Sequence, residues 1–500
     1  MAMTDLFLKR TALAQIDLLR TIQRTTKWQV PVAEQVAQAR ERADRTTDVN
    51  LKYLAQVTNE SYSTVYNTYN RMMTNLAAIG GEKATDKLLQ TPDGQLRVLL
   101  VQQSLAYQFL QHLVAEDMPN FDDFLTQAAV SKVTALRYLR PLRDFGKQMG
   151  VKISYEKMQL TGSEQAIRLF LTLSYWLATD GAAWPFTVVK HADAAAEATR
   201  VLKAYQLDMH NPVTLELFHY FTAISQTRLA QQHLAPAPVL ELSAVPNLYA
   251  TNTELSVWQQ ANESQQMLEI FLILPLAVGP NDPAVAEIDN GLARFSPVMR
   301  QLVDRFLEAT PSYRRSPFRR LLQVSLAAIA MSVVNLGFDL GALLAQFNPH
   351  IGGACVHDTD RPEIEAALTQ AMARTKNQAD APLNRRLKEM APLLVDRFHA
   401  TLFQLSRFAK PARPVKVGLL LEPAMLGFAD LLTFMNQQTN VELVYDHFEE
   451  ADLIIQDSSL PLHFPGKHQP LLFRWDIAAS GDLFGELAAL LRTLQQEFNQ

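Results

Sequence analysis

The feature of this sequence that most limits its fold is an amphipathic stretch at residues 130–142, which comes shortly after a potential helix cap. Ala135, Leu139 and Leu142 are spaced by four and three residues, so in a helix they share one face, which we expect to be buried. Asn120 can cap a short helix just upstream, and only a tight turn fits between the two segments. This arrangement predicts a helix-turn-helix.

The exposed face of the second predicted helix is polar and basic. A recognition helix presents its N-terminal residues to the major groove of DNA, where hydroxyls and cations can contact bases and phosphates. Residues 151–155 and 157–160 have the pattern of two short strands, which would form a wing that ends at Gly162. This winged helix-turn-helix offers five candidate DNA contacts, namely Ser131, Lys132, Thr134, Arg137 and Arg140.

The same pattern occurs once more, earlier in the chain, which strengthens the interpretation of both copies. Asn50, Ser61, Val65 and Met72 stand where Asn120, Ser131, Ala135 and Leu142 stand in the later copy. Where the later copy has Lys132, Arg137 and Arg140, the earlier copy has Tyr62, Asn67 and Asn70, which can form hydrogen bonds but cannot displace counterions from phosphates, so we expect it to contribute less to DNA binding. Its candidate contacts are Ser61, Ser63, Tyr66, Asn67 and Asn70.

The size and charge of the chain indicate a multidomain protein with at most a local affinity for nucleic acid. Its 500 residues exceed the roughly 250 to 300 that a single core accommodates. The net charge of -5 is compatible with a basic patch but not with a uniformly basic surface. The single cysteine, Cys355, excludes an intrachain disulfide, as is usual in a reducing cytoplasm. We expect a soluble, cytoplasmic protein with no signal peptide and no apolar run long enough to span a membrane.

The sequence lacks the motifs of common enzymes. It has no phosphate-binding glycine loop, no His-Glu-x-x-His, no Cys-x-x-Cys and no glycine-flanked serine nucleophile. The acidic pairs Asp122-Asp123 and Glu449-Glu450 are better explained as charge at a helix N-terminus and as a solvated face. The sequence therefore predicts a protein that is not an enzyme and has no cofactor or metal site.

Three short motifs located after the predicted wing point to a family. They are Gly162-Ser163-Glu164, Ile167-Arg168 with Phe170, and Trp184-Pro185-Phe186. Together with the paired winged modules they resemble the Mga/AtxA family of transcriptional regulators. The resemblance implies a DNA-binding activator that dimerises and is controlled by histidine phosphorylation. The partners it implies are double-stranded promoter DNA, the phosphocarrier proteins of the sugar phosphotransferase system and a second copy of the chain.

The predicted fold is mainly α, with helical periodicity across the middle of the chain and a small C-terminal α/β domain whose sheet is mostly parallel. The resemblance implies that the middle forms two bundles similar to phosphotransferase-system regulation domains and that the last domain is similar to enzyme IIB. The expected domains are residues 1–92 (N-terminal helix and first winged module), 93–163 (second winged module), 164–283 and 284–408 (the two bundles) and 409–500 (the enzyme IIB-like domain).

Four histidines of the helical middle are candidate phosphoryl acceptors, because an exposed imidazole held in one tautomer can be a nucleophile. They are His191, His210, His219 and His357. His219 stands nine residues before Arg228, loosely similar to the histidine-then-arginine helix of regulation domains. For each of the four, the alternative is an ordinary surface or core histidine.

The C-terminal domain is expected to associate and not to transfer phosphate. An active enzyme IIB of this type carries an acceptor cysteine just after its first strand, whereas this sequence has Glu422-Pro423 there. A surface for dimerisation is the simpler role. A second hypothesis for the whole chain is a helical interaction protein of the phosphotransfer network, whose winged folds bind protein instead of DNA.

Overall fold

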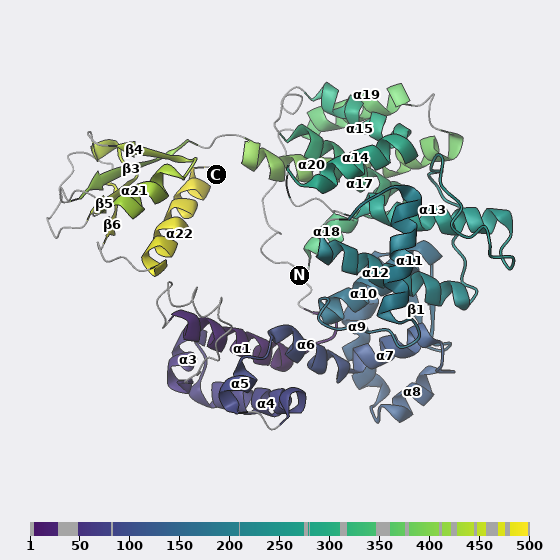
Figure 1. Ribbon diagram of the computed structural model, residues 1–500, viewed down its shortest axis with the longest axis horizontal. Helices are drawn as coiled ribbons and strands as arrows, with labels where there is room; N and C mark the ends of the chain where they lie inside the picture. Colours follow the sequence, from purple (N-terminus) through teal and green to yellow (C-terminus); the bar gives the residue numbers. More distant parts are fainter. Residues whose placement is uncertain are drawn as a thin grey trace. The chain divides into compact units, whose positions relative to one another are not determined.

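The computed structural model describes residues 5–28, 49–81, 84–209, 211–274, 279, 281–310, 318–346, 361–375, 380–409, 413–421, 428–444, 448–456, 469–475 and 481–498. The described chain is mainly helical and forms two compact units (Figure 1). The first comprises Met1–Arg20 and Leu51–Gln404, and the second comprises Thr21–Asn50 and Leu405–Gln500.

The earlier helix-turn-helix copy consists of α3 (Leu51–Thr58) and α4 (Tyr62–Gly80), and helix α1 (Arg10–Trp28) precedes it. The hydroxyl of Ser61 accepts a hydrogen bond of 3.1 Å from the backbone N–H of Thr64, so it caps α4. Val65 and Met72 are buried on one face of α4. The next described residues form a short helix, α5 (Thr85–Leu89), and not a pair of strands. The wing expected for this copy is therefore not formed by residues 84–92.

The later copy has the predicted winged arrangement. Its helices are α6 (Asp93–Gln102), α7 (Leu105–Ala115), α8 (Phe121–Gln127) and α9 (Lys132–Gln148). Strands β1 (Lys152–Ser154) and β2 (Gln159–Thr161) then pair antiparallel and form the wing. Asn120 caps α8 by accepting a hydrogen bond from the N–H of Asp123. A Cβ at Gly162, whose φ is +150°, would lie 2.8 Å from the carbonyl oxygen of Gly150, so the wing can only close with glycine there.

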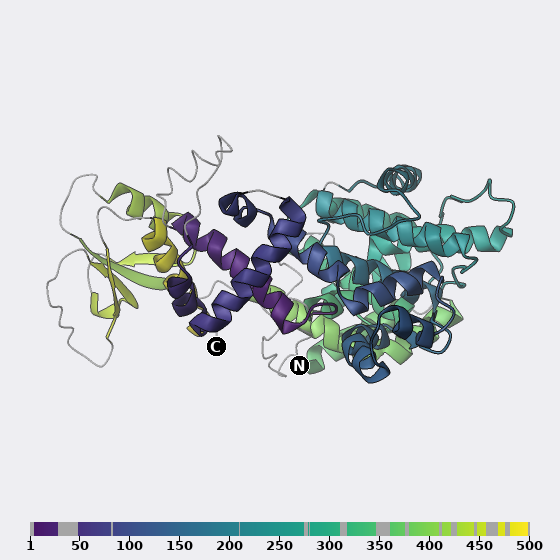
Figure 2. The same cartoon turned by 90° about the horizontal axis from the view of Figure 1, so that it is seen from below.

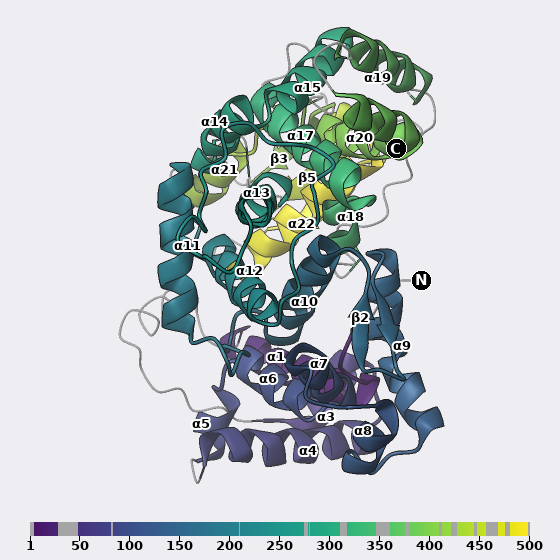
Figure 3. The same ribbon diagram turned by 90° about the vertical axis from the view of Figure 1, so that its right-hand side faces the viewer.

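The middle of the chain is helical, as its periodicity predicts. Its helices are α10 (Glu164–Thr179), α11 (His191–Tyr205), α12 (Pro212–Ala230), α13 (Val257–Ile273), α14 (Pro283–Phe295), α15 (Pro297–Ala309), α17 (Arg319–Leu336), α18 (Leu340–Ala345), α19 (Arg361–Thr375) and α20 (Ala381–Ala409). Helix α12 packs against both α10 and α11, and the pairing of α11 with α12 is visible in Figures 1 and 3. Helix α15 packs against α17 and α19.

One helix bears on the expectation about membranes. By length and composition alone, α17, which begins with Arg319 and Arg320, could cross a bilayer. However, 61% of its apolar window is buried inside the protein, as is usual for a core helix.

The C-terminal unit contains a four-stranded, all-parallel sheet in the order β4-β3-β5-β6. Its strands are β3 (Val415–Leu420), β4 (Val441–Val444), β5 (Leu453–Gln456) and β6 (Leu471–Arg474), with helices α21 (Ala429–Asn436) and α22 (Gly481–Glu497). Val417, Leu453 and Ile455 share its core with Leu487 of α22, which lies beside the sheet in Figures 1 and 2. This confirms the predicted parallel α/β fold. The position of Glu422-Pro423 lies outside the described residues.

Candidate functional site

Helix α9 has the capped N-terminus and the buried face of a recognition helix. The Ser131 hydroxyl accepts a hydrogen bond of 3.3 Å from the N–H of Thr134 and donates one of 2.9 Å to its hydroxyl. Ala135, Leu139 and Leu142 are each 0% exposed. Ser131 and Thr134 therefore serve the cap, and the side chains that remain available on this face are mainly cations.

The cations predicted to contact DNA lie on the solvent-exposed surface of α9. Lys132, Arg137 and Arg140 are all exposed. Arg140 pairs with Asp144 at 3.3 Å, but the Arg140 side chain is 72% exposed, so this pair is weak and its guanidinium can turn to a phosphate. The arrangement offers three positive groups along one helix face to an anionic partner.

Lys9 joins this basic face, which sequence reasoning missed. The Asp5 carboxylate pairs with Arg97 at 2.9 Å and thereby holds the chain start against α6. Lys9 Nζ then lies 3.8 Å from the ring centre of Tyr138, and Arg137 donates a hydrogen bond of 3.3 Å to the Tyr138 hydroxyl. Hydrogen bonding from Lys9, followed by that from Arg137, lowers the pKa of Tyr138. Lys9, Arg137 and Tyr138 line a pocket of about 600 Å³ beside α9.

The corresponding face of α4 is aromatic and polar. Tyr62 and Tyr66 are 50% and 47% exposed, and their rings stack with centres 6.2 Å apart. Asn67 and Asn70 are also exposed, whereas the Ser61 hydroxyl bonds to that of Ser63 at 2.9 Å. The positions of Lys132, Arg137 and Arg140 are thus taken in α4 by Tyr62, Asn67 and Asn70, which carry no charge, and the exposed cation of this face is Arg71, four residues after Asn67.

A buried ion pair joins α10, the helix that follows the wing, to α13. The guanidinium of Arg168, which is 0% exposed, donates hydrogen bonds of 2.6 and 3.0 Å to the two carboxylate oxygens of Glu263 and one of 3.2 Å to Glu164. Burial lowers the pKa of Arg168, but hydrogen bonding to Glu263 and the negative charges of Glu263 and Glu164 together outweigh it, so the net pKa is raised. Arg168 therefore stays charged and fixes α10 to α13.

A second buried arginine connects the DNA-binding module to the first bundle. Arg228 on α12 is 2% exposed and donates hydrogen bonds of 2.9 and 2.8 Å to the two oxygens of Glu164 at the start of α10. It also donates one of 2.8 Å to Glu116, the residue that ends α7. Glu116 Oε1 also lies 2.7 Å from His233 Nε2. One side chain thus joins α12 to the end of α7 and to the start of α10, and Glu164 and Arg168 belong to the sequence motif found after the wing.

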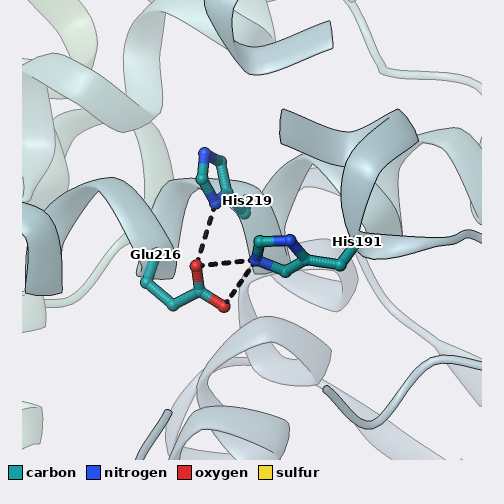
Figure 4. Close-up of side chains that lie close together, drawn as sticks. All are labelled: His191, Glu216 and His219. Carbon is teal, nitrogen blue, oxygen red and sulfur yellow. Dashed lines mark hydrogen bonds and ion pairs between the residues drawn. The ribbon is translucent and has the colours of Figure 1, made fainter. Parts of the chain in front are cut away.

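Two of the candidate phosphoryl acceptors lie together around one carboxylate (Figure 4). Glu216 Oε2 lies 2.9 Å from His191 Nε2 and 2.9 Å from His219 Nδ1. The His191 side chain is 47% exposed and that of His219 is 10% exposed. No local sequence signal indicates this grouping, because His191 and Glu216 are 25 residues apart on different helices.

His219 and Arg228 lie on the same helix, α12, as the sequence predicts, but their side chains are apart. Nine residues of helix separate them by roughly 13 Å, and Arg228 is occupied by Glu164 and Glu116. His210 and His357 lie outside the described residues.

Comparison with known families identifies the segment that contains α9. Residues 94–175 match the family model described as Mga helix-turn-helix domain. The matched segment begins in α6, includes α8, α9 and the wing, and ends within α10. No curated protein matches the chain.

Proposed function

We propose that this chain activates transcription from promoters that it binds mainly through α9. Through the helix-turn-helix domain of residues 94–175, the chain belongs to the Mga/AtxA family of transcriptional regulators. The observation that carries the proposal is the exposed basic face of Lys132, Arg137 and Arg140 on a helix whose opposite face is buried. Phosphate contacts by such cations supply most of the affinity of a DNA-binding protein.

Arg137 is assigned to base contact and Arg140 to the backbone, with Asn67 of α4 as a minor contact. Arg137→Ala should then weaken binding by about 1 to 3 kcal/mol if the arginine reads a guanine. Asn67→Ala should weaken it less. Both are measured by gel-shift titration of genomic promoter fragments. Equal losses at the two positions, or none at Arg137, would reject the assignment.

The same titration separates this function from the rival hypothesis, an interaction protein that has lost DNA binding. A regulator binds selected DNA fragments. The slope of its log affinity against log salt concentration falls in magnitude by about 0.9 for each phosphate contact that a substitution removes. A protein-binding module shows no specific fragment at any salt concentration. The exposed tyrosines of α4, Tyr62 and Tyr66, are the feature that favours the rival.

Control of this activity is assigned to phosphorylation of histidines in the first bundle by phosphocarrier proteins of the sugar phosphotransferase system. His219 donates its Nδ1–H to Glu216 and so keeps a lone pair on Nε2, while His191 is the more exposed of the two. His210 and His357 remain further candidates. A phosphoryl group adds close to two negative charges, and beside Glu216 these repel and bias the packing of α11 against α12.

Incubation with the phosphocarrier proteins and phosphoenolpyruvate, followed by mapping of acid-labile phosphate, tests this control. Label on His191 or His219 that disappears on substitution by alanine supports it. Coupling of about 1 to 3 kcal/mol would change DNA affinity roughly 5- to 150-fold. If no histidine in residues 187–406 is labelled, the bundles have another role.

Dimerisation is assigned to the C-terminal α/β domain, residues 409–500. Leu471 and Leu472 of β6 are 47% and 52% exposed, and apolar residues on an exposed strand favour association with a second copy. Removal of residues 409–500 should shift the protein towards monomer in sedimentation. An unchanged mass distribution would move the interface into the helical bundles.

A further inference from the structure

We infer that His191, Glu216 and His219 bind one divalent transition-metal ion of the zinc class. The three side chains each point one donor atom into the same space (Figure 4), and these donors lie within 4.8 Å of one another. Such an ion is a ligand that neither the DNA-binding function nor the phosphorylation of these histidines requires.

Two of the three donor distances are already close to those of a metal site. Glu216 Oε2 lies 2.9 Å from both His191 Nε2 and His219 Nδ1. Zinc bonds of about 2.0 to 2.2 Å in a tetrahedral arrangement place donor atoms roughly 3.3 Å apart. The carboxylate therefore has to move by a few tenths of an ångström relative to each ring. The two ring nitrogens, which lie within 4.8 Å of one another, have to approach by up to about 1.5 Å, which rotation of the half-exposed His191 side chain provides.

The scaffold holds the three ligands on rigid elements. Glu216 and His219 are three residues apart on α12 and so share one face of that helix. His191 is the first residue of α11, and its ring lies edge to face between the rings of Trp184 and His219, at centre distances of 4.7 and 5.3 Å. Because the His191 side chain is half exposed, an ion can reach the site from solvent.

The donor set selects the class of metal. Two imidazoles and one carboxylate suit Zn²⁺, Co²⁺, Ni²⁺ or Cu²⁺, whereas Ca²⁺ and Mg²⁺ require mostly oxygen ligands. Three protein ligands leave a fourth position open for water. Without metal, both rings donate N–H to Glu216, so binding requires each ring to present a lone pair there instead. Acid protonates the same nitrogens, and affinity should therefore fall as pH decreases.

Calorimetric titration of the full chain, free of any histidine tag, with ZnCl₂ tests the inference, and CoCl₂ provides a visible absorption band that reports the ligand geometry. We expect one ion per chain in the unmodified protein. His191→Gln and Glu216→Gln should each weaken binding at least 10-fold, since each removes a direct ligand. The band of bound Co²⁺ should disappear with them.

The matched control is His233→Gln, which removes a histidine that also contacts a glutamate, Glu116, at 2.7 Å. Cys355→Ser controls for capture by the single thiol. Both variants should bind as the unmodified chain does. No binding at 100-fold excess metal, or equal affinity in His191→Gln and His233→Gln, would overturn the inference. The readout involves no DNA and no phosphoryl donor, so its failure leaves the proposed function standing.

Discussion

Replacing Arg228 with methionine should separate the DNA-binding module energetically from the first bundle. Arg228 is 2% exposed and makes hydrogen bonds of 2.9 and 2.8 Å to Glu164 and one of 2.8 Å to Glu116. Methionine retains much of the apolar stem but removes all three contacts. It leaves the Glu164 carboxylate, whose side chain is only 10% exposed, without its main positive partner.

Loss of one partner from a buried ion pair lowers the free energy of unfolding by about 3 to 5 kcal/mol, since the remaining charge stays desolvated. Glu164 retains the 3.2 Å contact from Arg168, and Glu116 is 30% exposed. We therefore expect the lower end of that range, about 3 kcal/mol. In the double variant with Glu164→Gln, the destabilisation should fall short of the sum of the single effects by about 1 to 3 kcal/mol.

Urea denaturation followed by tryptophan fluorescence measures these values. Arg143→Met is the matched control, because Arg143 pairs with Asp144 at 3.1 Å while its side chain is 45% exposed, and its loss should change stability by at most about 0.5 kcal/mol. Equal stability of Arg228→Met and Arg143→Met would refute the role given to Arg228. Simple addition of the effects of Arg228→Met and Glu164→Gln would do the same.

Three smaller changes test other parts of the structure. Burial raises the pKa of Glu269 from 4.5 to about 7, so the folded state holds a proton that the unfolded state releases. The free energy of unfolding should therefore fall by roughly 3 kcal/mol as pH rises from 4.5 to 7. Urea denaturations of Glu269→Gln across that pH range should lack this fall. Gly162→Ala should destabilise the wing by about 1 to 3 kcal/mol and speed amide exchange in residues 150–162, whereas Gly485→Ala, where a Cβ meets nothing within 4 Å, should not destabilise the protein. Lys9→Ala should reduce the salt slope of DNA binding by about 1 if Lys9 contacts a phosphate; an unchanged slope would remove Lys9 from the interface.

The elements that sequence periodicity predicts are those whose signals are local. The spacing of Ala135, Leu139 and Leu142 predicts the buried face of α9, and Asn120 is the predicted cap of α8. A cap acts within a few residues of the helix start. Such signals can be read without knowledge of the tertiary structure.

The contacts that sequence reasoning missed are all between distant residues. Arg228 and Glu116 are 112 residues apart, and Lys9 reaches Tyr138 only because Asp5 is held by Arg97. Neither periodicity nor capping contains information about which charged side chains meet across packed helices. The first wing illustrates a different limit, since the helix-turn-helix pattern of residues 50–72 does not determine the structure of the residues after it.

The metal and the phosphoryl group are expected to compete at the same histidines. A metal withdraws electron density from the imidazoles it binds and fixes Glu216, whose acceptance of the ring N–H otherwise makes the distal nitrogen a better nucleophile. The bound dication also neutralises negative charge on Glu216, and the repulsion between Glu216 and a phosphoryl group depends on that charge. ZnCl₂ should therefore slow phosphoryl transfer to His191 and His219, and chelation should restore it. Labelling at an equal rate with and without one equivalent of zinc would show that the two ligands do not share these residues.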